Sequence, residues 1–195
     1  MRFLLVAAIA AALLTASSAF AQPGKSGDGS DGPVSDKDVA DRDVSDREFE
    51  KRCRAAVLDL HVFFEEWLNA RIPETADSAS RFRDVLAEDF EYIGAAGFKL
   101  PKSDLFTDGI WVGHGYWVQE GRGGGQTRVE KLEFRRISDS TAILTWEYWQ
   151  DTVEPDGTEK SRGRLDTGVF RLDAGTPHGC LWLHVQETQL PDMER

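Results

Sequence analysis

The sequence changes its hydrophobic period near its middle, and this change limits the possible folds more than any other feature. Apolar residues recur at steps of three and four between Phe49 and Leu68, which is the spacing of one face of a helix. From Thr127 onward apolar and polar residues alternate instead, which is the pattern of half-buried strands. Helices followed by strands predict an α+β domain, with the helical stripe packed on one face of an antiparallel sheet.

Local start and stop signals place the individual elements. Ser45 and Glu48 form a capping-box pattern, so we expect the first helix to begin there, and Pro73 ends it. The rest of this half predicts a helix over 80–87, a short strand over 90–93 and a helical segment from Pro101 toward Trp111. The second half predicts four strands joined by short connections into an antiparallel meander, over 127–137, 141–152, 162–172 and 181–189.

Residues 1–21 have the three parts of a secretory signal peptide. Met1 and Arg2 supply positive charge, residues 3–14 are apolar, and residues 19–21 have the A-x-A pattern of a cleavage site. The apolar stretch is shorter than the roughly 20 residues that span a bilayer. We therefore expect export by a cleavable signal peptide, to the periplasm or outside the cell, with no membrane anchor left after cleavage.

Residues 22–45 are rich in Gly, Ser and Asp and contain few apolar residues. Such a segment cannot bury enough surface to offset its ordering entropy, so we expect a disordered acidic leader. Its alternating acids suggest a calcium loop, but an EF-hand that starts at Asp41 places Asp46 where Gly is needed and Arg52 where Glu is needed. The folded domain is therefore expected over 46–191.

Charge and histidine placement exclude several kinds of partner. The chain has 34 acidic and 23 basic residues, whereas phosphate binding needs clustered Lys and Arg, so we expect no nucleic-acid partner. The four histidines are scattered without any ligand spacing, so we expect neither a metal nor another cofactor.

Cys53 and Cys180 are the two cysteines of the chain. Export to an oxidising compartment would allow them to form a disulfide. Two buried free thiols fit the sequence equally well, because sequence cannot show whether the two Cα atoms approach each other.

Several segments together carry a resemblance to a known family. They are Phe64-x-x-Trp67-Leu68, Leu86-Ala87-Glu88-Asp89-Phe90-x-Tyr92-Ile93, Gly97, Arg164-x-x-Thr167-Gly168-Val169-Phe170 and Leu181-Trp182-Leu183-His184-Val185-Gln186-Glu187-Thr188. In this order they resemble the nuclear transport factor 2-like superfamily, and more narrowly exported bacterial members of its SnoaL-like, ketosteroid-isomerase-like group. The resemblance covers nearly everything after Asp46. It implies a cone whose helices close over a curved sheet and leave a pocket at the open end.

Alternation along the strands predicts which side chains enter this cone. Leu183, Val185 and Glu187 share one face of the last strand, and the two aliphatic residues indicate that this face meets the helices. Arg164 on the preceding strand is then the expected partner of Glu187, with Asp166 on the same face. We expect the ligand-binding residues to be Trp67, Tyr92, Trp111, Glu147, Trp149, Arg164 and Glu187.

Three uses of this polar cluster remain open. It fits the binding of a small organic molecule in an aromatic-walled pocket, and it fits a buried Glu-Arg pair that only fixes strand register. The resemblance to isomerases implies a third use, carboxylate acid-base chemistry next to a carbonyl. No isomerase motif matches residue by residue, and Glu187 is the best candidate for a catalytic group. We expect a small-molecule-binding or assembly domain first, and a cofactor-independent isomerase, dehydratase or cyclase as the alternative.

The opposite, convex face of the sheet is expected to carry an apolar patch. Trp182 and His184 share that face of the last strand, and Trp146 and Tyr148 of another strand are placed with them. A large exposed apolar patch usually marks an interface, so we expect a homodimer through the convex face.

Overall fold

The computed structural model describes residues 36–106, 111, 113–122 and 124–194, and for residues 36–45 and 193–194 it describes the backbone alone. The predicted signal peptide and the leader up to residue 35 lie outside the described residues. Within them, no helix is long and apolar enough to cross a membrane.

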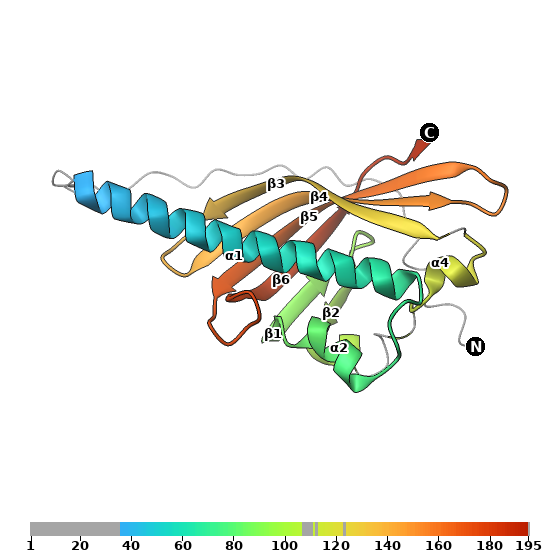
Figure 1. Cartoon of the computed structure of the whole chain (residues 1–195), viewed down its shortest axis with the longest axis horizontal. Helices are drawn as coiled ribbons and strands as arrows, with labels where there is room; N and C mark the ends of the chain where they lie inside the picture. Colours follow the sequence, from blue (N-terminus) through green and yellow to red (C-terminus); the bar gives the residue numbers. More distant parts are fainter. Residues whose placement is uncertain (1–35, 107–110, 112, 123, 195) are drawn as a thin grey trace.

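The described chain begins with two helices, continues with short strands and short helices, and ends with a series of strands (Figure 1). The helices are α1 Asp36–Leu68, α2 Ala76–Arg83, α3 Lys102–Asp104 and α4 Tyr116–Gln119. The strands are β1 Leu86–Ile93, β2 Lys99–Pro101, β3 Gly125–Arg136, β4 Thr141–Val153, β5 Glu159–Leu172, β6 Cys180–Gln189 and β7 Met193–Glu194. The four predicted strands of the second half are confirmed within three residues at each end.

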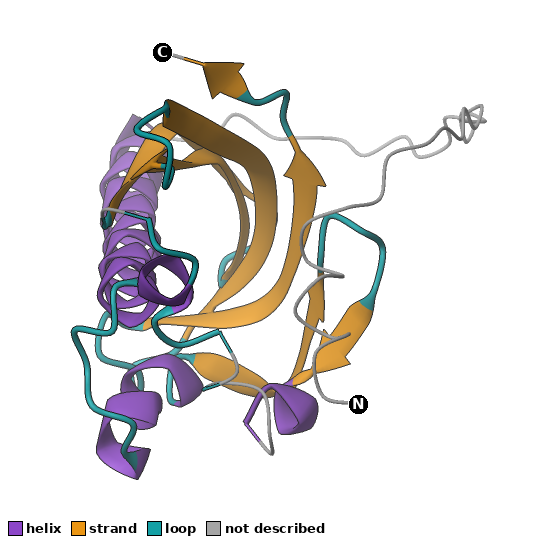
Figure 2. Cartoon of the chain, turned by 90° about the vertical axis from the view of Figure 1, so that its right-hand side faces the viewer, coloured by secondary structure: helices purple, strands orange, loops and turns teal. Residues whose placement is uncertain are grey.

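The strands form a single sheet in the order β2-β1-β6-β5-β4-β3, with β7 paired to β5. The predicted antiparallel meander is confirmed for β3 to β6, whereas β1 joins β6 as a parallel neighbour. The sheet curls strongly, and α1 lies across its concave side (Figure 2). We call the side that faces α1 the inner face and the opposite side the outer face.

The first helix is longer than predicted. It begins at Asp36 instead of Ser45, so the predicted start of the helix is wrong, and residues 36–45 of the predicted leader are helical. No Gly or Pro interrupts the sequence between Asp36 and Leu68, so the backbone continues the helix through the capping-box pattern. The added turns extend α1 beyond the end of the sheet (Figure 1).

The second helix begins and ends earlier than predicted. The Thr75 hydroxyl accepts a hydrogen bond from the Ser78 backbone N–H at 3.2 Å and so caps α2. The helix therefore begins at Ala76, four residues before the predicted start. The predicted helical end, residues 84–87, is wrong because Leu86 pairs with Trp182 and begins β1. The helical segment predicted from Pro101 contains α3 and continues as π-helix over residues 105–106, residues 107–110 lie outside the described residues, and Trp111 lies in a turn.

The predicted helical stripe forms the core contact of α1. Phe49, Val57 and Leu60 are each at most 4% exposed and pack against the sheet. Cys53 and Cys180 form a disulfide, with their Cα atoms 5.2 Å apart, which joins α1 to the start of β6. The pairing interpretation of the two cysteines is therefore correct, and the crosslink spans 127 residues of sequence.

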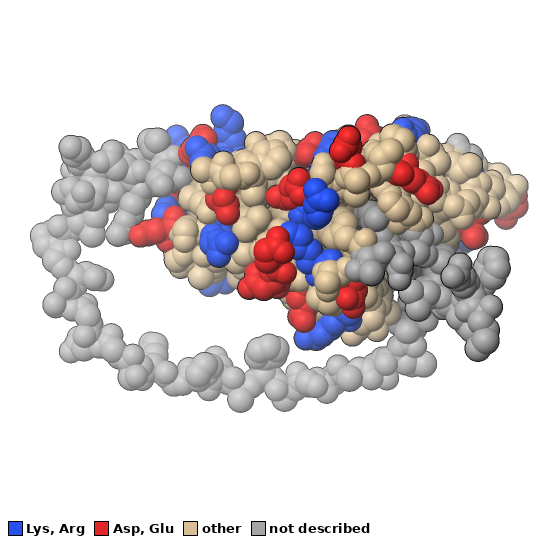
Figure 3. Space-filling view, turned by 90° about the horizontal axis from the view of Figure 1, so that it is seen from below, with Lys and Arg blue, Asp and Glu red and all other residues tan. Residues whose placement is uncertain are grey.

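Charged side chains of both signs are interspersed on the surface drawn in Figure 3. Several of them pair across elements. Arg81 of α2 contacts Asp59 at 2.6 Å and Glu66 at 2.9 Å, and both carboxylates belong to α1. These pairs are about one-third exposed, so each contributes only ~0–1 kcal/mol to stability.

Candidate functional site

The inner face of β4 carries the residues that were expected on the outer face. The His61 ring of α1 stacks on the Tyr148 ring with centroids 4.3 Å apart, and it lies 5.9 Å from the Trp146 ring. Trp146 and Tyr148 are each 1% exposed, so both point inward. Glu147 and Trp149 alternate with them and therefore lie on the outer face, and their predicted place inside the cone is wrong.

Local contacts explain why Trp149 is buried on the outer face. Gly163 lies beside it on β5, and a Cβ at this position would come within 2.5 Å of the Trp149 ring. The Arg128 guanidinium lies 5.0 Å from the centroid of that ring, and the indole N–H donates to Glu147 at 3.1 Å. Hydrogen bonds from Lys131 and then Trp149 lower the pKa of Glu147. Trp149 is 6% exposed, and these neighbours on β3, β4 and β5 contribute to its burial.

A bulge in β6 moves Trp182 from the outer to the inner face. Phe170 pairs with Trp182 and Val169 pairs with His184, so Leu183 is the extra residue of the bulge. The Trp182 ring lies 4.7 Å from the Phe170 ring and 3% of the residue is exposed. The expected outer patch of Trp146, Tyr148, Trp182 and His184 is therefore wrong, because its three large aromatic residues are in the core. The homodimer stays a prediction without this patch to support it.

Beyond the bulge, β6 and β5 bring together the expected ion pair. Arg164 Nη1 lies 2.9 Å from Glu187 Oε1 and donates to Oε2 at 3.1 Å. The Glu187 side chain is 9% exposed and that of Arg164 is 23% exposed. The Arg164 guanidinium also lies 4.6 Å from the centroid of the Tyr148 ring. Burial acts to lower the pKa of Arg164, but the Glu187 and Asp166 carboxylates more than offset this and raise it.

A second carboxyl group faces this pair. Asp166 lies directly opposite Glu187 on β6 and opposite Trp146 on β4, and it is 3% exposed. Its Oδ1 has no hydrogen-bond partner among the described residues. Burial is the main cause that raises the pKa of Asp166 to about 7, and Glu187 raises it further, whereas Arg164 and the Trp146 indole lower it. Asp166 therefore changes its charge near neutral pH.

The histidine and tyrosines around these carboxyl groups are uncharged at neutral pH. Both ring nitrogens of His61 are buried without a partner in the described part of the chain. Burial and then the charge of Arg164 lower the pKa of His61 to about 3. Burial raises the pKa of Tyr148 to about 12, and burial followed by Glu187 raises the pKa of Tyr92. We call the set His61, Tyr92, Tyr148, Arg164, Asp166 and Glu187 the inner cluster.

The inner cluster contains three of the seven predicted ligand-binding residues, Tyr92, Arg164 and Glu187. Trp67 packs against Phe64 on α1 with ring centroids 6.3 Å apart, and Trp111 packs against His114 at 5.4 Å. Both contacts lie at the C-terminal end of α1 and the 111–115 turn. We therefore do not count Trp67 and Trp111 in the cluster.

Sequence reasoning missed His61 and Tyr148 and gave Asp166 no role. His61 follows Val57 by four residues and precedes Phe64 by three, so the helical period already placed it on the buried stripe of α1. Asp166 follows Arg164 by two residues, which put both on one face of the strand. The burial of these polar groups was the information that the sequence lacked.

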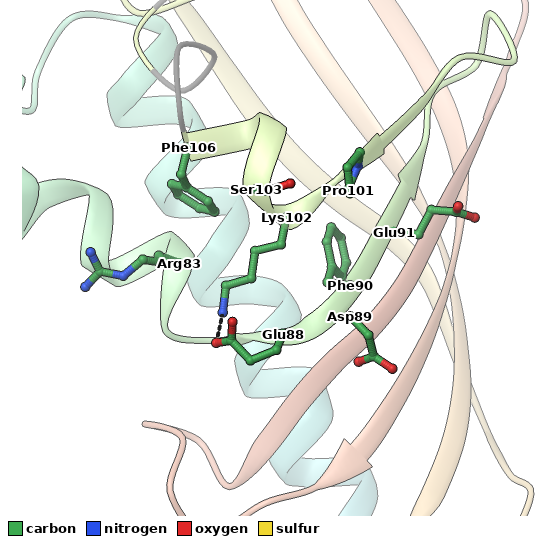
Figure 4. Close-up of a pocket in the computed structure, with 9 residues that line it drawn as sticks. All are labelled: Arg83, Glu88, Asp89, Phe90, Glu91, Pro101, Lys102, Ser103 and Phe106. Atoms are coloured by element: carbon green, nitrogen blue, oxygen red, sulfur yellow. Dashed lines mark hydrogen bonds and ion pairs between the residues drawn. The ribbon is translucent and has the colours of Figure 1, made fainter.

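A separate hollow of about 370 Å³ lies between α2, β1 and α3 (Figure 4). Lys102 reaches across it and donates to the Leu86 carbonyl at 2.8 Å and to Glu88 at 2.9 Å. The hollow is lined by Arg83, Glu88, Asp89, Phe90, Glu91, Pro101, Lys102, Ser103 and Phe106. It contains no member of the inner cluster, and its lysine is already engaged. In the same described part of the chain, no group of three His, Cys, Asp or Glu side chains is placed to hold a metal ion.

Solved structures share this architecture. An NTF2-like protein of unknown function from Pseudomonas aeruginosa is 23% identical, with a TM-score of 0.56 over 72% of this chain and 99% of that one. LinA, a hexachlorocyclohexane dehydrochlorinase, is 11% identical, with a TM-score of 0.53 over 77% and 94% of the two chains. No protein-family model and no curated protein matches the sequence. The chain has the NTF2-like fold that the sequence resemblance implied, and at these identities the likeness extends to the fold alone.

Proposed function

We propose that this protein binds a small organic molecule at the inner cluster. The observation that carries the proposal is a group of buried polar atoms that have no hydrogen-bond partner among the described residues, namely Asp166 Oδ1, both ring nitrogens of His61 and the indole nitrogen of Trp146. Each such atom costs about 1–3 kcal/mol when it is left unsatisfied, and such atoms are rare in folded proteins. A bound molecule with polar groups would supply the missing hydrogen bonds and remove this cost.

The surroundings of these atoms support an organic ligand. The rings of Trp146, Tyr148 and Tyr92 lie around the carboxyl groups, and the Trp182 ring lies 5.7 Å from that of Trp146. Apolar and aromatic walls with a few polar groups are typical of sites for small organic molecules. These aromatic residues belong to the curved sheet, and α1 lies across the concave side of that sheet (Figure 2).

The proposal is tested by native mass spectrometry of the protein as purified, followed by thermal-shift assays with small carbonyl compounds, aromatic acids and amines. We expect a bound or stabilising compound whose effect is lost in Asp166→Asn. Glu147→Gln is the matched control, because Glu147 also sits on a strand of the same sheet and pairs with a cation, but on the outer face. The proposal would be contradicted if the protein purifies without a ligand and no compound stabilises it. It would also be contradicted if both variants lose the stabilising effect of the compound equally.

A second function, acid-base catalysis, is favoured by the pKa of Asp166, which is raised to about 7. A carboxyl group near this pKa can take a proton from a carbon next to a carbonyl and return it to another atom of the same molecule. The proton count balances without a cofactor, which fits an isomerase, dehydratase or cyclase. Asp166→Asn should then abolish turnover of a carbonyl compound even at concentrations high enough to saturate the weakened variant. Turnover that survives in Asp166→Asn at such concentrations would refute catalysis by this carboxyl group.

We also propose that the protein acts outside the cytoplasm. Disulfides persist in oxidising compartments, and the Cys53–Cys180 bond is consistent with export by the predicted signal peptide. N-terminal sequencing of the protein from fractionated cells tests this. The expected first residue is Gln22, and an intact Met1 in the cytoplasmic fraction would contradict export.

A further inference from the structure

We propose that the ligand of the inner cluster is a small organic cation, such as a protonated amine, held by the Asp166 carboxylate. This inference rests on the proposed binding function and names the class of ligand. It follows from the balance of charges around Asp166 and from the atoms that are already engaged.

The charged and titratable groups that face Asp166 come from each element packed around it. They are Arg164 on β5, Glu187 on β6, Tyr148 on β4 and Tyr92 on β1, and His61 on α1 lies against the Tyr148 and Trp146 rings. The two tyrosines and the histidine are neutral, as described above. Arg164 is therefore the one cation in this set, and it faces two carboxyl groups. When both carboxyl groups are ionised, the cluster holds one uncompensated negative charge.

An anionic ligand fits this arrangement poorly. An arginine in an aromatic site would ordinarily attract a carboxylate, but Arg164 Nη1 already binds both oxygens of Glu187. A further anion would add to the excess negative charge in a buried site, and burying an unpaired charge costs several kcal/mol in general. Carboxylates and phosphates are therefore disfavoured as ligands.

A protonated amine meets both requirements. Its N–H groups donate to Asp166 Oδ1, which has no partner among the described residues, and its charge cancels the excess. Trp146 lies directly opposite Asp166 on β4, and an aromatic ring beside the carboxylate favours a cation, as the Arg164 position over Tyr148 already illustrates. The neutral His61 ring offers one acceptor nitrogen for a second N–H group.

Binding of such a cation competes with protonation of Asp166. In the free protein a proton neutralises the carboxyl group below a pKa of about 7, and the ligand has to displace this proton. The affinity therefore increases with pH and levels off above the pKa. For a pKa of about 7, the affinity at pH 8 is about tenfold higher than at pH 6, and about half a proton is released per ligand at pH 7.

The test is isothermal titration calorimetry with two sets of probes that differ in one group. The first set is benzylamine, benzyl alcohol and benzoate, and the second is methylamine, methanol and formate for a smaller site. We expect an amine to bind more tightly than the alcohol and acid of its set, with the tenfold gain from pH 6 to pH 8. Titrations at pH 7 in two buffers of different ionisation enthalpy measure the released proton. Asp166→Asn should weaken the amine and remove the pH dependence, whereas Glu147→Gln should change neither.

The outcomes separate the ligand class from the binding function. Tighter binding of benzoate or formate, or amine binding that does not change between pH 6 and pH 8, overturns the cation proposal and leaves the binding function standing. Binding of the alcohols alone does the same. A native ligand that co-purifies with the protein and carries no positive charge also refutes the cation. Failure of every probe, together with the absence of any co-purifying ligand, overturns both proposals. The pH profile of the wild-type protein is decisive even if Asp166→Asn does not fold.

Discussion

Replacing Asp166 by Asn should change how stability depends on pH, because this carboxyl group carries a raised pKa in the folded protein. A pKa of about 7 when folded, against an ordinary value near 4, means that the folded state binds the proton more tightly than the unfolded chain does. The stability from this group is fully present below pH 4. It is lost as the pH rises through 7, because the folded state must then ionise a buried carboxyl group.

The size of this loss follows from the two pKa values. The difference of about three pH units corresponds to about 4 kcal/mol between pH 4 and pH 8, at about 1.4 kcal/mol per unit. About 1 kcal/mol of it is already lost at pH 5, so about 3 kcal/mol separates pH 5 from pH 8. Asn keeps the shape of the side chain but does not titrate, so the stability of Asp166→Asn does not decrease in this way as the pH rises.

The assay is urea denaturation of wild type and Asp166→Asn at pH 5, 6, 7 and 8, without added ligand. The free energy of unfolding of the variant, minus that of wild type, should grow by about 3 kcal/mol from pH 5 to pH 8. Glu147→Gln should show no such growth, because the pKa of Glu147 is lowered and lies below this range. A difference that stays constant with pH would refute the burial of an unpartnered Asp166.

Three other substitutions follow from the structure. His61→Phe keeps the stack on Tyr148 and removes a ring whose pKa is lowered from an ordinary 6.5 to about 3 in the folded protein. The stability that wild type has from its neutral His61 is present above pH 6.5 and is lost as the pH falls toward 3, so the variant should gain ~2 kcal/mol relative to wild type from pH 7 to pH 5 in urea denaturation. An equal loss of stability toward acid in both proteins would contradict a neutral His61. Cys53→Ala should lower the free energy of unfolding by about 3–5 kcal/mol, and a reductant should lower wild type toward the variant but leave the variant unchanged. Gly163→Ala should displace the Trp149 ring, lower the free energy of unfolding by about 1–3 kcal/mol and shift the tryptophan fluorescence to the red. An unchanged spectrum and an unchanged stability would show that the outer face has room for the added methyl group.

The strands of the second half were predictable because their pattern is redundant. β3 to β6 are each at least ten residues long and are separated by short connections, so one atypical residue changes little. The α2 helix was predicted four residues late for a different reason. Residues 84–87 fit a helix locally, and the parallel pairing of β1 with β6, which is a long-range contact, decided their conformation.

The faces of the strands were harder to predict than the strands themselves. On β4 both faces carry large aromatic residues, Trp146 and Tyr148 inside and Trp149 outside, so alternation alone does not say which face meets α1. Only the space above Gly163 and the contact with Arg128 show where the Trp149 ring lies. On β6 the bulge at Leu183 changes the alternation in mid-strand, and no residue of the sequence announces it.

The third use that the sequence left open, a pair that only fixes strand register, explains part of the inner cluster. Arg164 and Glu187 form such a pair and would fix the register of β5 and β6 by themselves. Asp166 Oδ1 makes no hydrogen bond to the described residues, and the burial of this carboxyl group costs up to about 4 kcal/mol of stability at neutral pH. That is a large share of the 5–15 kcal/mol by which proteins are typically stable. A purely structural role would be served better by Asn or an apolar residue at position 166, so the carboxyl group is best explained by a ligand or a proton that it binds.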